Sequence, residues 1–245
     1  MVANLVNNTL PEIDIKKDLR DVKIRGFIKS LRKDNTGVGY TLETLLGIKE
    51  NNHGEPDLVY NSLKIELKTQ RKEANSRITL STKSPIWKPF SDREILNKVG
   101  YIDKKNRRGL KVILKIGEYN RKGLKLDLDV KKDRLNIMHK DKGVLCYFVF
   151  SDLIKSVENK IYSNLLLVLA ETRKEDNEEF FHYVEATLFS DFKEESFKKL
   201  LLEGILIWEF RMHLKETGAV RDHGSGLRIS RKYLGVLFEK EEKIL

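Results

Sequence analysis

Short runs of strand-forming residues recur along most of this chain, and they constrain its fold more than any other feature. Most of them alternate apolar and polar residues or are rich in Val, Ile, Phe and Tyr, and turn-forming residues separate them. The runs lie at residues 57–70, 77–84, 111–117, 123–132, 134–140, 144–150, 165–172, 180–191 and 205–214. Helical patterns interrupt them at residues 39–50, 151–161 and 193–204. This order predicts an α/β (α+β) fold in which helices flank a central mixed β-sheet.

One of these runs, PDLVYNSLKIELK at residues 56–68, alternates strictly toward its end. Its odd-numbered apolar residues would lie on one face of a strand, and its even-numbered charged residues on the other. The run can be an amphipathic strand with a solvated polar face. Alternatively, Asp57, Glu66 and Lys68 can form a site that binds a metal ion and transfers protons.

The second interpretation fits the hydrolysis of a phosphodiester bond, which needs an activated water and a counter-charge for the phosphate. Mg²⁺ supplies both and prefers carboxylate and backbone oxygens. A hairpin through residues 61 and 62 would bring Asp57 beside Glu66, and the Leu67 carbonyl could be a third ligand. Lys68 could orient the attacking water, and Glu43 on the preceding helix could support the site or bind a second ion.

The net charge indicates a polyanionic partner. The chain has 47 Lys and Arg residues against 37 Asp and Glu, a formal charge of +10. A basic globular chain of this kind most often binds DNA or RNA. Its N-terminus lacks the pattern of a secretory signal, and no apolar run approaches the ~20 residues of a membrane helix. We therefore expect a cytoplasmic protein.

Several other chemistries are not indicated. The single cysteine, Cys146, lies in the apolar run GVLCYFVF, so we expect a buried reduced thiol and no internal disulfide. The chain has no Cys-x-x-Cys or His-Glu-x-x-His pattern and no phosphate-binding P-loop. We expect neither a zinc site nor a bound nucleotide.

A second group of polar residues lies near the C-terminus. In the run ILIWEFRMHL, Glu209, Arg211 and His213 would share the face opposite the large apolar residues. All three can pair with base edges, and the loop RDHGSGLRIS adds His223 and Arg228. These residues can instead form a charged outer strand and a flexible loop. The basic stretch KKNRRG at residues 104–109 is expected to follow DNA phosphates.

Three segments in the same order carry a resemblance to a known family. SLRKDNTGVGYTLETLLGI, PDLVYNSLKIELKTQ and ITLSTKSP resemble the MvaI/BcnI family of type II restriction endonucleases. This family is related to the mismatch-repair nickase MutH within the PD-(D/E)xK nuclease superfamily. The C-terminal segments YNRKGLKLDLDVKKDRLNI, LFSDF, IWEFRMHL and DHGSGLRI extend the resemblance over most of residues 25–230.

The resemblance implies an active site made of Glu43, Asp57, Glu66 and Lys68, with one or two Mg²⁺ ions. It also implies a monomer with a single active site that cuts one DNA strand and then the other. A cognate DNA methyltransferase would be a cellular partner.

The resemblance further assigns base reading to residues of the C-terminal group. These are Glu209, Arg211, His223 and Arg228, with Lys83, His213 and Arg221 as further DNA contacts. Glu209 stands where family members have the shorter Asp, and Arg221 stands where they have His. The target sequence therefore does not carry over.

Two lobes that form a DNA-binding cleft are expected. Residues 25–120 would form a catalytic lobe, residues 121–245 a DNA-recognition lobe with a shared core, and residues 1–24 an N-terminal segment without an assigned role. The expected function is Mg²⁺-dependent, sequence-specific cleavage of double-stranded DNA. The alternatives are a MutH-like site-specific nickase and a DNA-binding protein without catalysis.

Overall fold

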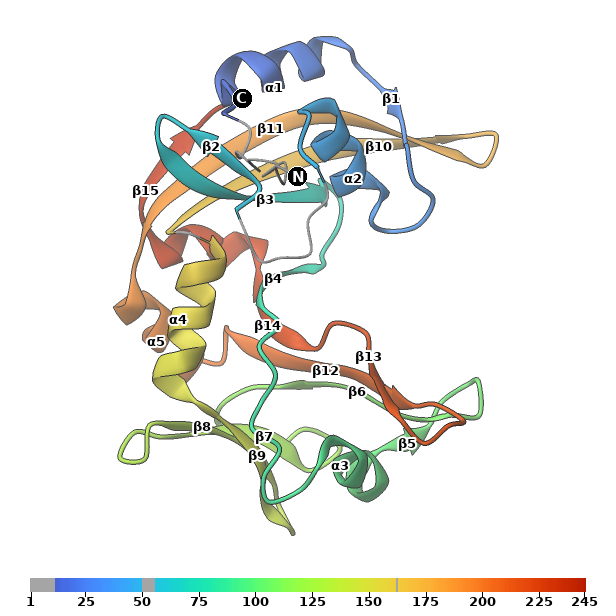
Figure 1. Ribbon diagram of the computed structural model, residues 1–245, viewed down its shortest axis with the longest axis vertical. Coiled ribbons are helices and arrows are strands. Elements are labelled where there is room, and N and C mark those ends of the chain that lie inside the picture. The colour runs from blue at the N-terminus through green and yellow to red at the C-terminus, as the bar shows by residue number, and fades with distance from the viewer. Residues whose placement is uncertain (1–11, 50–55, 162) are drawn as a thin grey trace, which may run out of the picture. The chain divides into compact units, whose positions relative to one another are not determined.

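The computed structural model describes residues 12–49, 56–161 and 163–245 of the chain (Figure 1). The chain divides into two compact units, and each unit is built from separate segments. Unit 1 comprises Met1–Ala74, Lys160–Phe192 and Phe238–Leu245, and unit 2 comprises Asn75–Asn159 and Lys193–Leu237. Because each unit contains segments from distant parts of the chain, the units do not coincide with the continuous ranges 25–120 and 121–245. The assignment of catalysis to the first range and of DNA recognition to the second stays a prediction.

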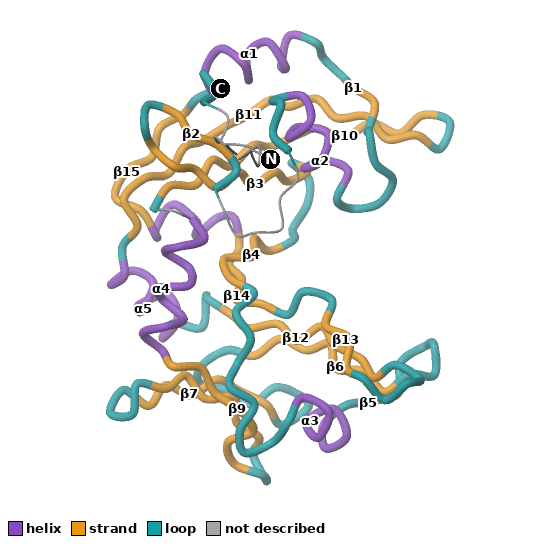
Figure 2. The backbone as a smooth tube through the Cα atoms, in the orientation of Figure 1, coloured by secondary structure: helices purple, strands orange, loops and turns teal. Residues whose placement is uncertain are grey.

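Unit 1 is built on one mixed, six-stranded sheet, as the sequence predicts. The strand order is β1–β11–β10–β3–β2, and β15 pairs with β11. β3 and β10 are parallel, and the other strand pairs are antiparallel. The bounds are Ile28–Lys29 for β1, Leu58–Tyr60 for β2, Leu63–Arg71 for β3, Asn164–Glu175 for β10, Glu178–Phe192 for β11 and Phe238–Lys243 for β15. Figure 2 shows β10 and β11 as a long pair joined by a short loop.

Two helices bury one face of this sheet. Helix α1 (Ile15–Ile24) begins at Asp14, whose side chain accepts a hydrogen bond from the Lys17 N–H at 3.2 Å. Helix α2 (Gly37–Leu45) packs against β3, and α1 packs against β11. Their apolar residues join Ile65 and Leu67 of β3 in a single core cluster. Ile65 and Leu67 therefore face the core, as the alternation predicts, whereas Leu63, at the start of the strand, is 41% exposed and does not.

Unit 2 contains two antiparallel sheets. A six-stranded sheet has the order β4–β14–β12–β6–β5, with β13 pairing to β12, and a three-stranded sheet has the order β7–β8–β9. The larger sheet contains β4 (Arg77–Ser81), β5 (Tyr101–Ile102), β6 (Arg108–Leu114), β12 (Ile207–Leu214), β13 (Val220–Asp222) and β14 (Gly226–Ser230). The smaller one contains β7 (Leu124–Asp129), β8 (Arg134–His139) and β9 (Gly143–Val149).

Aromatic packing forms much of the core of unit 2. Trp208 of β12 is 1% exposed, and its ring centroid lies 4.6 Å from that of Phe148 and 6.0 Å from that of Phe210. The helices associated with this unit are α3 (Asp92–Val99), α4 (Phe150–Ile161), α5 (Glu194–Leu202) and the 3₁₀ helix η1 (Arg231–Leu237). The last two residues of α4, Lys160 and Ile161, belong to unit 1.

Some expectations can be checked directly. Cys146 is fully buried, and burial raises the pKa of its thiol, which agrees with a structural role. Residues 91–108, to which the sequence pattern assigns no structure, contain α3 and β5. Among the described helices, none is both long and apolar enough to span a membrane. Residues 1–11 of the N-terminal segment lie outside the described residues.

Candidate active site

The β2–β3 hairpin brings Asp57 beside β3, as the sequence predicts. Asn61 and Ser62 form its turn with φ values of +48° and +66°, a conformation that Asn tolerates better than most residues. Leu58 then pairs with Ile65, and the Asp57 N–H donates to the Ile65 carbonyl at 3.1 Å. The register therefore fixes Asp57 next to the middle of β3.

The carboxylate of Asp57 is held in a setting that disfavours its charge. Its Oδ2 accepts a hydrogen bond from the Leu67 N–H at 2.7 Å. Burial, followed by the negative charge of Glu66, raises the pKa of Asp57 to about 6, and the charge of Glu43 adds to the effect. The Leu67 hydrogen bond and the Lys68 charge oppose the rise. Three carboxylates thus share one electrostatic environment.

Glu66 is buried and pairs with two lysines that are themselves partly exposed. It is 3% exposed, so the solvated-face interpretation of this strand does not apply to it. Its Oε1 accepts a hydrogen bond from the ammonium group of Lys68 and lies 3.1 Å from Nζ of Lys160. A buried carboxylate requires such compensation, because an unpaired buried charge is strongly destabilising.

Lys160 is absent from the candidate residues that the sequence predicts. It is near the end of α4, on the polar face of an amphipathic helix, where a lysine is ordinarily solvated. It reaches Glu66 because β10, which follows α4, pairs in parallel with β3 and aligns Leu165 with Glu66. No local pattern predicts the partner of a parallel strand so distant in sequence.

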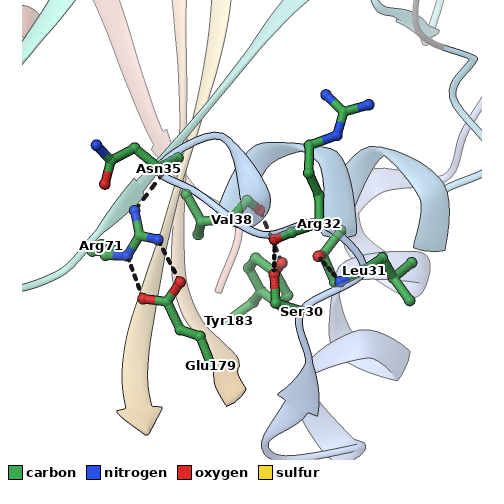
Figure 3. A network of polar contacts seen from close by, with 9 residues as sticks. Ser30, Leu31, Arg32, Asn35, Val38, Arg71, Glu179 and Tyr183 are labelled. Carbon is green, nitrogen blue, oxygen red and sulfur yellow. Dashed lines mark hydrogen bonds and ion pairs between the residues drawn. The ribbon is translucent and has the colours of Figure 1, made fainter. Parts of the chain in front are cut away.

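Glu43 reaches this environment from α2, which a polar network holds in place (Figure 3). Arg71 of β3 donates to both carboxylate oxygens of Glu179 at 2.9 and 2.7 Å, and to the Asn35 carbonyl at 3.2 Å. The Tyr183 hydroxyl donates to the Val38 carbonyl at 2.9 Å. These bonds join the start of α2 to β3 and β11, so they set the position of Glu43.

We expect Arg71→Met to lower the free energy of unfolding by about 1–2 kcal/mol, because Glu179 and the Asn35 carbonyl lose their charged donor in a half-buried setting. Chemical denaturation would measure the change. Lys72→Met is the control, because its ion pairs with Glu171 and Glu185 are more exposed and should contribute much less to stability. Equal losses in the two variants would contradict a specific role for Arg71.

The residues present fit a hard divalent cation in part. Asp57 and Glu66 offer carboxylate oxygens, and their mutual repulsion, visible in the raised pKa of Asp57, is what a cation between them would relieve. In the described part of the chain, no three His, Cys, Asp or Glu side chains converge to hold a metal ion. A cation at this position would be held by this carboxylate pair and would complete its coordination with backbone oxygen or water.

The C-terminal polar group gathers on β12, β13 and the loop that leads into β14, all in unit 2. Glu209 and Arg228 are each 9% exposed. Arg228 Nε lies 2.8 Å from Glu209 Oε2, and Arg211 Nε lies 3.0 Å from Glu209 Oε1. Neither Nε–H points along a hydrogen-bond direction, so these contacts are ion pairs. Arg228 also donates to the Thr79 hydroxyl and, at 2.7 Å, to the Gly224 carbonyl.

The loop itself is tied to β12, which does not fit the alternative of a flexible loop. The Arg211 N–H donates to the Ser225 hydroxyl at 2.8 Å, and the His223 N–H donates to the Arg211 carbonyl at 2.7 Å. Asp222 Oδ1 accepts a hydrogen bond from the Ser225 N–H at 2.6 Å. A Cβ on Gly226 would lie 2.7 Å from the Ser81 carbonyl oxygen, so only glycine fits where β14 meets β4.

The remaining candidates differ in exposure. His223, Arg221 and Lys83 are exposed, whereas His213 is 7% exposed and bonds to His223. Arg107, one of the residues 104–109 that are expected to follow phosphates, bonds to Asp103 and His213. The sequence pattern does not predict these partners, and the phosphate contacts of this stretch stay a prediction.

Comparison with known proteins gives consistent results. A model of the MvaI/BcnI restriction endonuclease family matches residues 16–238. The chain is similar to a solved complex of restriction endonuclease MvaI with its cognate DNA substrate, with 25% sequence identity, a TM-score of 0.80, and coverage of 94% of this chain and 97% of that one. It is also similar to MvaI in the absence of DNA, with 25% identity, a TM-score of 0.55, and coverage of 94% and 96%. Among curated proteins, no significant match was found.

Proposed function

This chain belongs to the MvaI/BcnI restriction endonuclease family, and we propose that it cuts its DNA target with Mg²⁺, as a monomer, one strand after the other. As a family member it is a type II restriction endonuclease, a sequence-specific enzyme that hydrolyses phosphodiester bonds in DNA. Its mixed fold matches that of MvaI, in agreement with the PD-(D/E)xK-like fold that the sequence predicts.

One observation carries the proposal. The carboxylates of Asp57 and Glu66 are close enough for the charge of Glu66 to raise the pKa of Asp57, and Lys68 donates a hydrogen bond to Glu66. Asp57 and Glu66, with the Leu67 carbonyl, would hold the ion. When bound, Mg²⁺ would supply a counter-charge for the phosphate and lower the pKa of its water ligand. Glu43 would act from outside this pair, through its charge.

Lys68 is the residue that we propose to handle the attacking water. It lies on the same face of β3 as Glu66, two residues further along, and Glu66 fixes its ammonium group. From there it would orient the water and offset negative charge that develops on the phosphate. Its side chain is 26% exposed, so it is partly accessible to a substrate.

With one active site at Asp57 and Glu66, a monomer would cut the two antiparallel strands in two successive events. Because such an enzyme would also cut unprotected host DNA, a cognate methyltransferase and a cytoplasmic location belong to the proposal.

Supercoiled plasmid lacking DNA methylation tests the proposal. We expect nicked circles first and discrete linear fragments later, with Mg²⁺ but not with EDTA. Lys64→Ala, a change of an exposed lysine on the same strand face, should cut normally, whereas Lys68→Ala should not. Nicked circles that persist at long times would instead support the MutH-like nickase. Cleavage in EDTA would refute the metal dependence, and binding without cleavage would refute the proposed active site.

Lys160 gives a further prediction, because its positive charge competes with a cation for Glu66. We expect Lys160→Met to tighten Mg²⁺ binding by on the order of threefold to tenfold, a modest effect since the lysine is 37% exposed. Isothermal titration with Mg²⁺ in the absence of DNA would measure it. Lys155→Met, on an exposed position of the same helix, is the control and should leave the affinity unchanged. Weaker binding in Lys160→Met would mean that the lysine supports the site.

A further inference from the structure

Four side chains of unit 2 form a continuous hydrogen-bonded chain from a half-buried carboxylate, Asp103, to an exposed histidine, His223. Asp103 Oδ2 accepts from Arg107 Nε at 3.0 Å and from Nη2 at 2.7 Å. Arg107 Nη1 lies 3.3 Å from His213 Nε2. His213 Nδ1 lies 2.8 Å from His223 Nε2.

The two imidazoles meet edge to edge. Their planes are inclined by 17° and their centroids are 4.8 Å apart, while the two nitrogens are 2.8 Å apart. Rings stacked face to face could not bring two nitrogens closer than the plane separation of about 3.5 Å that van der Waals contact allows. The short contact is therefore a hydrogen bond between ring nitrogens.

The direction of each hydrogen bond follows from the first. A guanidinium has donors only, so His213 Nε2 must be the acceptor and carries no proton. Neutral His213 then holds its proton on Nδ1 and donates it to His223 Nε2. His223 Nε2 is an acceptor in turn, so neutral His223 holds its proton on Nδ1.

The charges around Arg107 and His213 favour the same directions of hydrogen bonding. The hydrogen bonds from Arg107 hold the pKa of Asp103 at about 2, so Asp103 stays ionised and keeps Arg107 in place. Burial, followed by the charge of Arg107, lowers the pKa of His213, which disfavours a second proton on its ring. Arg221, paired with His213 across β12 and β13, acts in the same direction, and Asp103 opposes it.

We propose that Arg107 and His213 are positioning residues that fix the proton of His223 on Nδ1, so that His223 presents a hydrogen-bond donor to DNA. The part of this inference that concerns DNA rests on the proposed role of His223 in base reading. An Nδ1–H donor selects the acceptors of the major groove, which are purine N7, guanine O6 and thymine O4. It cannot pair with the amino groups of adenine or cytosine.

Proton positions can be measured without DNA. Long-range ¹H–¹⁵N correlation spectra of protein labelled with ¹⁵N-histidine report which ring nitrogen carries a proton. In the wild type we expect protons on Nδ1 of both His213 and His223. In Arg107→Met, His213 should populate the Nε2–H form, and His223 should change with it. Arg108→Met, in the same basic stretch, should leave both rings as in the wild type.

Arg107→Lys serves as a conservative variant, because lysine also has donors only and should restore the wild-type proton positions if it reaches His213. A proton on His213 Nε2 in the wild type would overturn the inference, whatever the enzyme does to DNA. Because this result comes from the wild-type protein, it tests the inference even if Arg107→Met fails to fold.

Cleavage of modified targets tests the reading role separately. Substrates carry, at one position each, an analogue without a major-groove acceptor: a 7-deazapurine, 2-aminopurine for guanine, or 5-methyl-2-pyrimidinone for thymine. We expect one position at which the wild type loses about tenfold to a hundredfold in kcat/KM and Arg107→Met loses much less. If the ring protons are where we expect them but no analogue impairs cleavage, the reading role alone is overturned. Absence of any cleavage would refute the proposed function but would leave the assigned proton positions of His213 and His223 standing.

Discussion

Asp57→Asn is expected to reduce DNA cleavage by at least about a thousandfold and, at the same time, to make the protein more stable at pH 7.5. The loss of activity follows from the proposed role of Asp57 in holding the metal ion, which is worth several kcal/mol in the transition state. Asparagine can still accept the Leu67 hydrogen bond, so the hairpin should remain intact. A substitution of an exposed carboxylate outside the site would not be expected to lower DNA cleavage and raise stability at the same time.

The gain in stability follows from the pKa of Asp57. In the unfolded chain this pKa is close to 3.8, and in the folded protein it is about 6. Between these values the folded state binds more protons than the unfolded state, so the free energy of unfolding falls as the pH rises from about 4 to about 6. At pH 7 and above the whole penalty is present, and the shift of roughly two pKa units corresponds to about 3 kcal/mol. The neutral side chain of Asp57→Asn avoids it.

Thermal unfolding in EDTA between pH 4 and pH 8 would measure this effect. We expect the Tm of Asp57→Asn to exceed that of the wild type by several degrees at pH 7.5 and to approach it near pH 4. Asp127→Asn removes one negative charge from unit 2 and is the matched control, without a pH-dependent gain. A pH-independent difference for Asp57→Asn, or a loss of stability at pH 7.5, would mean that burial and Glu66 do not strain this carboxylate.

Arg228→Met is expected to destabilise the protein by about 3 kcal/mol, which corresponds to a fall in Tm of roughly 6–12 °C. Arg228 and Glu209 are 10% and 12% exposed at their side chains, and Arg228 also binds the Thr79 hydroxyl and the Gly224 carbonyl. Removal of the arginine leaves the charge of Glu209 in the interior with Arg211 as its remaining cation. Chemical and thermal denaturation would measure the loss.

Two further variants separate the buried charge from the lost packing. Glu209→Gln combined with Arg228→Met should recover at least half of the stability, since no unpaired buried charge then remains. Arg211→Met should cost less than about 1 kcal/mol, because the Arg211 side chain is 39% exposed. If Arg211→Met is as destabilising as Arg228→Met, the two arginines compensate the charge of Glu209 equally, which would contradict the larger contribution expected of Arg228.

The sequence predicts the local parts of this molecule well. The alternation of residues 63–68 and the turn at Asn61 and Ser62 are enough to predict the hairpin that brings Asp57 to β3. The helix that carries Glu43 and the mixed order of strands follow from similar short-range patterns. Such features depend on neighbours within about ten residues, so periodicity and turn chemistry determine them.

Features that depend on distant partners could not be predicted in this way. Lys160 contacts Glu66 only because β10 is the parallel neighbour of β3, and parallel strands do not reveal their register in the sequence. Arg107 stands in a basic stretch whose composition indicates phosphate contacts, yet Asp103 and His213 bind it. In both cases the pairing of strands decides which charges meet.

The interleaving of the two units has a consequence for how the enzyme is made. Asp57 and β3, which carries Glu66, leave the ribosome early, but the neighbouring strand β10 starts about a hundred residues later, and β15 begins only at Phe238. At synthesis rates of roughly 5–20 residues per second, the nascent chain lacks this neighbour for about 5–20 s. Chains that terminate before β10 should thus carry the acidic residues without the strand that aligns them, so that the proposed active site can assemble only after β10 has been synthesised.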